Sequence, residues 1–178
     1  MKKYIFIPAI LLALAPVYAF APAATWQIAD KSVIRFSAGG EVGGIFKTMK
    51  GAVVFDEQNP PASSFDLTID VASVNTGNAL MNTHIKSADW FDAGKYPVIR
   101  FVSKKVVKSG TGLQVTGDME MHGVKKETTI PFTFQNKGAT AVFSSKFAIN
   151  RNDFHIGKPG GDVDENVKLD ITVPVVKK

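Results

Sequence analysis

Few residues of this chain are of types that carry acid–base, metal or nucleophilic chemistry. The sequence contains three histidines, His84, His122 and His155, and no cysteine. The histidines lack the His-Glu-x-x-His spacing of a metalloprotease, and no Gly-x-Ser-x-Gly turn of a serine hydrolase occurs. The lack of cysteine excludes thiolate zinc sites, disulfides and cysteine nucleophiles. A zinc site assembled by the three histidines from distant loops is the one metal hypothesis that stays open.

Two other kinds of cluster resemble ion-binding segments but lack the required spacing. Asp162, Asp164 and Glu165 lie close together without the ligand order of an EF-hand loop, so we interpret them as a solvated turn. The glycine clusters at 39–44 and 157–161 lack the Gly-Lys-Ser/Thr ending of a phosphate-binding loop. In a β protein such glycines mark bulges or bends of the sheet. The chemistry-bearing residues therefore indicate no reaction, and the apolar residues become the informative ones.

The amino-terminal segment predicts export. Two lysines precede an apolar run that ends in the small-residue pattern Val-Tyr-Ala at 17–19, which is typical of a cleaved secretory signal peptide. The run is shorter than the roughly 20 residues that span a bilayer. We therefore expect a signal peptide at 1–19 and one exported domain at 20–178. Removal of the lysine pair lowers the formal net charge from +5 to +3, and the remaining lysines are too dispersed for a nucleic-acid-binding stripe.

Composition and alternation predict an all-β domain. After residue 19 the chain has 18 Val, 10 Ile and 12 Phe but only four Leu, which suits a pleated surface better than a helical bundle. From Phe65 to Val71 every odd residue is apolar and every even residue is polar, which is typical of a half-buried strand. About eight such segments separated by turns indicate a sandwich or a barrel. We expect strands at 26–38, 51–56, 65–71, 97–107, 113–121, 129–134, 143–149 and 167–173.

One segment interrupts the alternation. Between Thr76 and Phe91 apolar residues recur every four positions, which predicts a short amphipathic helix at about 77–89 with Asn78 or Thr76 as its cap. The helix would cover one face or one end of the barrel. A barrel of eight strands is either filled by its own side chains or holds one small ligand. Inward Phe and Met residues suit a long, flexible, apolar guest, although a solidly packed core explains them equally well.

Six short motifs occur in order between residues 25 and 176. A tryptophan leads the first strand, and a Ser-Val-x-Thr, an Asp-Trp-Phe-Asp, a Tyr-Pro, a His-Gly and an Asn-Arg segment follow. These segments read Trp26-Gln27-Ile28, Ser73-Val74-Asn75-Thr76, His84-Ile85-Lys86-Ser87-Ala88-Asp89-Trp90-Phe91-Asp92, Tyr96-Pro97-Val98-Ile99-Arg100-Phe101, Gly117-Asp118-Met119-Glu120-Met121-His122-Gly123-Val124-Lys125-Lys126 and Ile149-Asn150-Arg151-Asn152-Asp153-Phe154. Together they resemble the YceI-like family of exported bacterial proteins.

The resemblance implies an eight-stranded antiparallel, lipocalin-like barrel that carries a polyisoprenoid or similar long-chain lipid, such as a fatty-acid-like one, in its interior. It implies a periplasmic protein without catalytic residues, metal or cofactor, and it leaves transient membrane contact and a homodimer open. Two departures concern the expected rim. The glycine-rich segment 37–45 lacks the histidine that many members carry there, and His155 stands where the family pattern has glycine.

The resemblance and the alternation together predict which side chains face the ligand. Trp90 and Phe91 would form part of the wall of the entrance. Arg151, with Asn150 and Asp153 beside it, would contact the head group or form a structural ion pair. Two rival functions remain: a periplasmic hydrolase or metal-dependent enzyme that uses His84 or His155, and an interaction module without a cavity. The residues expected to point inward toward the lipid are Phe36, Phe55, Phe65, Leu67, Ile69, Ile99, Phe101, Met119, Phe132, Phe143 and Phe147.

Overall fold

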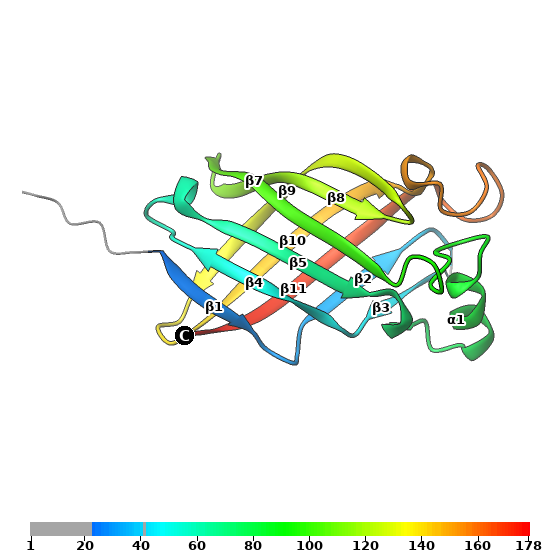
Figure 1. Cartoon of the computed structure of the whole chain (residues 1–178), viewed down its shortest axis with the longest axis horizontal. Helices are drawn as coiled ribbons and strands as arrows, with labels where there is room; N and C mark the ends of the chain where they lie inside the picture. The colour runs from blue at the N-terminus through cyan, green and yellow to red at the C-terminus, as the bar shows by residue number, and fades with distance from the viewer. Residues whose placement is uncertain (1–22, 41) are drawn as a thin grey trace, which may run out of the picture.

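The strands of the molecule form one antiparallel sheet that closes on itself (Figure 1). The computed structural model describes residues 23–40 and 42–178, so the predicted signal peptide lies outside the described residues. The strands are β1 (Ala24–Ile28), β2 (Val33–Ser37), β3 (Gly43–Phe46), β4 (Met49–Phe55), β5 (Ser64–Asp70), β6 (Val74–Asn75), β7 (Val98–Ser109), β8 (Gly112–Met121), β9 (Val124–Asn136), β10 (Thr140–Asn150) and β11 (Asn166–Lys177).

The ring consists of eight antiparallel segments in chain order. β11 pairs with β1 at one end and with β2 at the other, so β1 and β2 act as two halves of a single segment. In the same way β3 and β4 act as two halves of one segment, as do β5 and β6. The antiparallel pairings run in the same order in both halves, β1–β4–β5 in one and β2–β3–β6 in the other. The pairing of β1 with β11 closes the ring. The predicted eight-stranded antiparallel barrel is therefore confirmed.

Two local expectations for the first segments were incomplete. The strand predicted at 26–38 is divided by a turn, in which the Ser32 hydroxyl donates to the Ala29 carbonyl at 3.0 Å. The glycine cluster at 39–44, expected to be a bend, contains the start of β3. A Cβ on Gly44 would lie 3.0 Å from the tip of the Phe36 ring, so the glycine leaves space for that ring on the neighbouring strand. Paired glycines carry no alternation, which is why the pattern did not predict this strand.

The predicted helix is present but shorter. Helix α1 covers Ala79–Lys86, and Asn78 caps it by accepting hydrogen bonds from the backbone N–H groups of Leu80 and Met81 at 2.9 and 3.1 Å. It ends at Ser87, whose backbone is extended, and a series of turns follows. Two helical turns direct only a narrow stripe inward: Ile85 is buried, whereas Leu80 is 79% exposed. Among the described residues no helix is long and apolar enough to cross a membrane.

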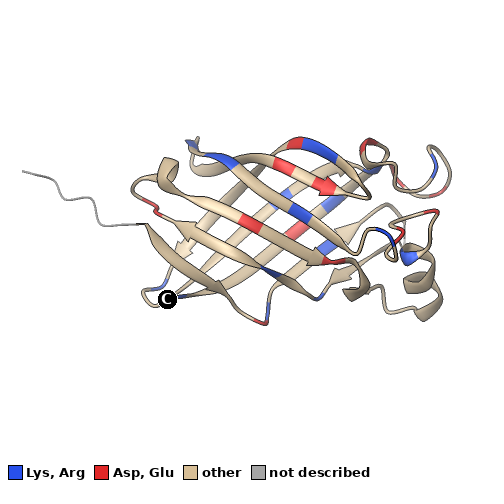
Figure 2. Ribbon diagram, in the orientation of Figure 1, with Lys and Arg blue, Asp and Glu red and all other residues tan. Residues whose placement is uncertain are grey.

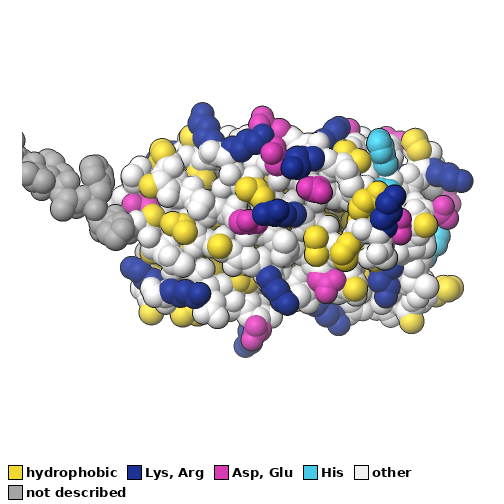
Figure 3. Space-filling view, in the orientation of Figure 1, with side chains coloured by type: hydrophobic (Ala, Val, Ile, Leu, Met, Phe, Trp, Pro, Cys, Tyr) yellow, Lys and Arg dark blue, Asp and Glu magenta, His cyan; other side chains and the backbone are white. Residues whose placement is uncertain are grey.

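The two ends of the barrel are covered differently. Helix α1 and the segment 151–165 lie at one end, and the carboxyl terminus lies at the opposite end (Figure 1). Basic and acidic residues are interspersed along the outer faces of the strands (Figures 2 and 3). Several of them form ion pairs, such as Arg100 with Asp66 at 2.8 Å and Lys146 with Asp170 at 3.0 Å. The end that α1 covers contains the candidate site.

Candidate functional site

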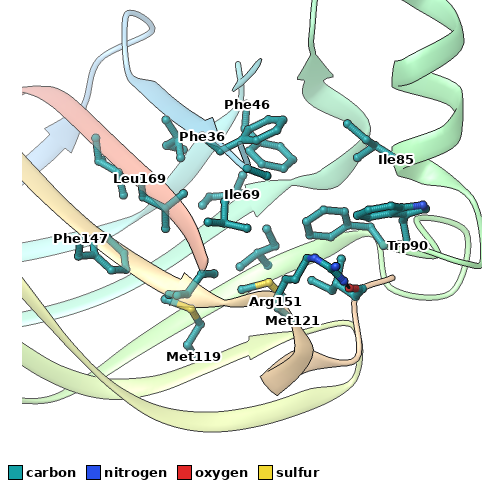
Figure 4. A pocket seen from close by; sticks show the side chains of 18 of the residues that line it. Phe36, Phe46, Ile69, Ile85, Trp90, Met119, Met121, Phe147, Arg151 and Leu169 are labelled. Carbon is teal, nitrogen blue, oxygen red and sulfur yellow. Dashed lines mark hydrogen bonds between the residues drawn. The ribbon is translucent and has the colours of Figure 1, made fainter. Parts of the chain in front are cut away.

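A cavity of about 270 Å³ occupies the half of the barrel next to α1 (Figure 4). Its wall consists almost entirely of apolar side chains that alternate strands direct inward, such as Ile69 on β5 and Met119 on β8. Figure 4 shows Phe36, Phe147 and Leu169 converging on the same space from β2, β10 and β11. The expectation of a core filled solidly by the protein's own side chains is therefore wrong for this half of the barrel.

A second, smaller cavity of about 100 Å³ lies farther along the bore. Phe65, Phe132 and Phe143 line it, and it shares wall residues with the first cavity. The shared residues are Met49, Leu67, Phe101, Ile130 and Ile171. Because five residues belong to both walls, the two cavities are neighbouring compartments of one bore, separated by a constriction at these side chains.

Beyond the second compartment the bore is filled by aromatic rings. Phe55 is 2% exposed and packs against four other phenylalanines, with centroid distances of 4.6 Å to Phe134 and 5.2 Å to Phe143. Trp26 packs edge-on against Phe134 at 5.4 Å. We call this end the closed half and the end with the larger cavity the open half. The aromatic residues of the closed half are Trp26, Phe55, Phe65, Phe132, Phe134 and Phe143.

The structure places the predicted inward residues at three depths. Phe65, Phe132 and Phe143 line only the second compartment. Phe55 lines neither compartment: its direction was predicted correctly, but alternation gives no depth along the bore, and the residue lies within the aromatic cluster. The predicted residues that line the first compartment are Phe36, Leu67, Ile69, Trp90, Phe91, Ile99, Phe101, Met119, Phe147 and Arg151.

Other lining residues were missed for two different reasons. Some lie on predicted strands at apolar positions of the alternation, so the pattern already contained them; these are Ile34, Met121, Ile130, Ile149, Val167, Leu169 and Ile171. Met49 belongs to β4 but lies one inward position before the strand predicted at 51–56. Others lie on elements without alternation, on the helix, the short β3 or the loops, where no sequence signal assigns a direction. These are Ala38, Val42, Phe46, Met81, His84, Ile85, Ile156 and Val163.

The mouth of the cavity is built around Trp90. Its indole N–H donates to Nε2 of His84 at 2.8 Å, which requires an unprotonated Nε2 on that imidazole. His84 lines the cavity and is itself exposed, so the cavity reaches the molecular surface beside it. The Trp90 ring also lies 5.5 Å from the Arg151 guanidinium. The wall position predicted for Trp90 and Phe91 agrees with this geometry, and His84 joins it.

Arg151 is a structural residue of the mouth. It is 2% exposed, and the neighbouring carboxylate of Asp153 is not its partner, because Asp153 pairs with Lys126 at 2.8 Å. Its five N–H groups instead face six oxygens of the segment that crosses the open half. These are Asn152 Oδ1 and the carbonyls of Ile156, Lys158, Gly160, Val163 and Asp164, at 2.8–3.3 Å.

Gly157 completes this packing. Its φ of +67° is a conformation that other residues rarely adopt, and a Cβ there would lie 3.1 Å from Arg151 Nη1 and 3.2 Å from the Trp90 ring. Trp90, Arg151 and Gly157 therefore form a tight stack at the mouth. Because protein oxygens already surround the Arg151 guanidinium, a head group would have to displace one of them to hydrogen-bond with it.

Several of the remaining polar side chains of the described residues have separate partners. Within residues 23–40 and 42–178, no three His, Asp or Glu side chains are grouped so that they could hold a metal ion. His122 Nδ1 lies 3.2 Å from the Phe154 carbonyl, and its ring packs edge-on against Tyr96. On the outer face, the hydrogen bond from Arg100 lowers the pKa of the Asp66 carboxyl from its ordinary value. The cavity itself can hold an apolar guest by desolvation, and its wall presents almost no polar contact.

Comparisons with known proteins agree on one family. A family model described as the YceI-like domain matches residues 26–175. Protein YceI of Escherichia coli O17:K52:H18 (strain UMN026 / ExPEC) is 35% identical over 141 residues, which cover 76% of this chain and 74% of that protein. A UPF0312 protein of Pseudomonas putida (strain GB-1) is 37% identical over 142 residues, covering 76% and 73% of the two chains.

Solved structures give the same result at the level of the fold. The crystal structure of Burkholderia cenocepacia BcnA superposes with a TM-score of 0.76 at 29% identity, covering 81% of this chain and 96% of that one. A polyisoprenoid binding domain from Saccharophagus degradans, implicated in plant cell wall breakdown, superposes with a TM-score of 0.69. It is 18% identical and covers 88% of this chain and 99% of its own, so the likeness is one of fold.

Proposed function

The chain belongs to the YceI-like domain family, and from this membership and the cavity we propose that it binds a long-chain isoprenoid or similar amphiphilic lipid. The lipid tail occupies the barrel interior, and the protein transports or stores it without catalysis. The observation that carries the proposal is the apolar, two-compartment bore that opens beside His84. The polyisoprenoid-binding description of the Saccharophagus degradans domain supports the ligand class.

The energetics of such a site need no catalytic or charged group. Each buried methylene contributes about 0.8 kcal/mol, so a ten-carbon stretch gives roughly 8 kcal/mol before the cost of ordering the chain. We propose that Phe36, Ile69, Met119 and Phe147 contact the tail and that Trp90 lies at the entrance. The predicted signal peptide supports a periplasmic location, where a lipid between two membranes requires a protected environment.

Gentle purification from cells, followed by organic extraction and mass spectrometry, tests the proposal. We expect a long-chain lipid in the extract of the wild-type protein. The matched control is Ile69→Trp, which places an indole inside the first compartment and should leave the extract empty. A wild-type extract without lipid would count against a carrier, and equal lipid in both extracts would show that the lipid lies outside the bore.

A further inference from the structure

The bore ends at the aromatic cluster of the closed half, and the position of this end limits how much of a ligand tail the bore can hold. The first compartment holds about 270 Å³, the second about 100 Å³, and the aromatic cluster of the closed half follows directly. Phe143 belongs to both features: it lines the second compartment and packs against Phe55, Phe65, Phe132 and Phe134. A tail that enters at the mouth therefore meets Phe143 and its neighbours as an end wall.

The volumes of the two compartments indicate how many carbon atoms of a ligand tail they can hold. A closed apolar cavity of about 150 Å³ takes up one benzene molecule, which corresponds to roughly 25 Å³ per carbon. On this scale the first compartment accommodates about ten carbons and the second about four more. We propose that the bore measures the tail of its ligand and fully buries about three isoprene units or an acyl chain of similar length. This inference rests on the proposed function and adds a limit on ligand size.

The constriction between the compartments is formed by adaptable side chains. Met49 and Leu67 contribute to both walls, and methionine in particular changes rotamer readily to admit a neighbour. The end wall differs in kind, because its rings pack against one another. Phe65, Phe132 and Phe143 are each at most 8% exposed, and their ring centroids lie 5.7–6.0 Å apart. A longer tail would have to separate these rings, so its additional carbons remain outside the mouth in water.

Binding of a graded series of prenyl alcohols to the wild-type protein tests the limit. Geraniol, farnesol and geranylgeraniol carry two, three and four isoprene units, and the emission of Trp90 at the mouth reports binding. Since each buried methylene tightens binding about fourfold, we expect a decrease in Kd of roughly tenfold or more from geraniol to farnesol after ordering costs. From farnesol to geranylgeraniol the decrease should be less than about threefold, because no further carbon is buried.

The outcomes separate the length limit from the function on which it rests. A Kd that stops decreasing at farnesol supports both the length limit and lipid binding. A decrease in Kd that continues undiminished to geranylgeraniol overturns the length limit but not lipid binding. Failure to bind any of the three alcohols overturns both the length limit and lipid binding.

A variant pair tests the end wall directly. Phe143→Leu shortens the side chain at the end of the second compartment, so geranylgeraniol should gain about threefold or more relative to geraniol. Phe154→Leu is the matched control, because Phe154 is also buried (3% exposed, against 8% for Phe143) but lines neither compartment. Incomplete folding weakens both apparent affinities by the same factor and cancels from their ratio. A ratio that stays unchanged in Phe143→Leu would overturn the assignment of this residue as the end of the bore.

Discussion

The closed and open halves of the barrel consist of the same strands with the same alternation, yet one is filled and the other is hollow. On β5, Phe65 is buried among rings of the closed half, whereas Ile69, two inward positions later, is only half-buried and lines the cavity. On β10, Phe143 and Phe147 differ in the same way. Alternation fixes the direction of a side chain, but the presence of facing rings at the same depth decides whether the bore is filled.

The two halves also differ in how they are closed toward solvent. The closed half needs no cover, because its rings occupy the interior. The open half is covered by α1 and by the segment 151–165, and Arg151 holds that segment through hydrogen bonds to its carbonyls. The proposed function therefore depends on the half that is less well packed.

Truncation of one ring in each half gives the largest expected difference. Phe55→Ala should lower the free energy of unfolding by about 3–5 kcal/mol, because it leaves a void among four rings. Phe147→Ala should cost less than about 2 kcal/mol, because its ring already faces the cavity. Urea denaturation of both variants measures the difference. Equal losses would show that the two halves are packed equally well.

Enlarging an inward residue should give the reverse contrast. Val175 is 1% exposed and lines neither compartment, so Val175→Trp overpacks the closed half and should cost about 1–3 kcal/mol. Ile69→Trp adds its volume to an existing cavity and should change the free energy of unfolding by less than about 1 kcal/mol. Thermal unfolding of both variants provides the comparison. A large loss of stability in Ile69→Trp would mean that the open half has no room.

The sequence predicted which strand side chains point inward, but it did not predict how far along the bore each of them lies. The alternation from Phe65 to Val71 predicted β5 and its inward face, because period two is a property of one strand alone. Whether Phe55 faces a void or other rings depends on Phe132, Phe134 and Phe143, which lie on other strands at the same height. That information resides in the register between strands, which no single segment contains.

The mouth was the least predictable region for a related reason. The resemblance placed Trp90 and Arg151 near the entrance, but the partner expected for Arg151 was a carboxylate beside it in sequence. Backbone carbonyls hold the guanidinium instead, and the sequence contains no signal for them because every residue has a carbonyl. His84 was considered only for chemistry, and its hydrogen bond to Trp90 follows from how α1 meets the turn behind it.

A conservative change at Arg151 tests whether the cover of the open half is independent of the barrel. Arg151→Lys keeps the charge but replaces five fixed donors by three mobile ones, so several buried carbonyls lose their partner. We expect a loss of about 2 kcal/mol in unfolding free energy and faster hydrogen exchange confined to 151–165. Arg100→Lys on the outer face is the control and should leave both the unfolding free energy and the hydrogen exchange of 151–165 unchanged. Faster exchange across β8 or β9 would show that the cover and the barrel unfold together.

The smallest effect is expected at Asp66, which lies on β5 between the two halves but points outward to Arg100 at 2.8 Å. The hydrogen bond from Arg100 lowers the pKa of Asp66, so the carboxylate contributes stability above its unfolded pKa of about 3.9, and this contribution is lost as the pH falls through the lower folded value. The pair is exposed, so Asp66→Asn should be only slightly less stable than the wild type near neutral pH, and the difference should vanish once the pH lies below the folded pKa of Asp66. Urea denaturation across this pH range measures the difference in stability.

Binding of farnesol to Asp66→Asn should be unchanged, because the flanking Phe65 and Leu67, not Asp66, face the bore. A loss of binding in Asp66→Asn would reverse the inward and outward faces of β5, and with them the contrast between the halves.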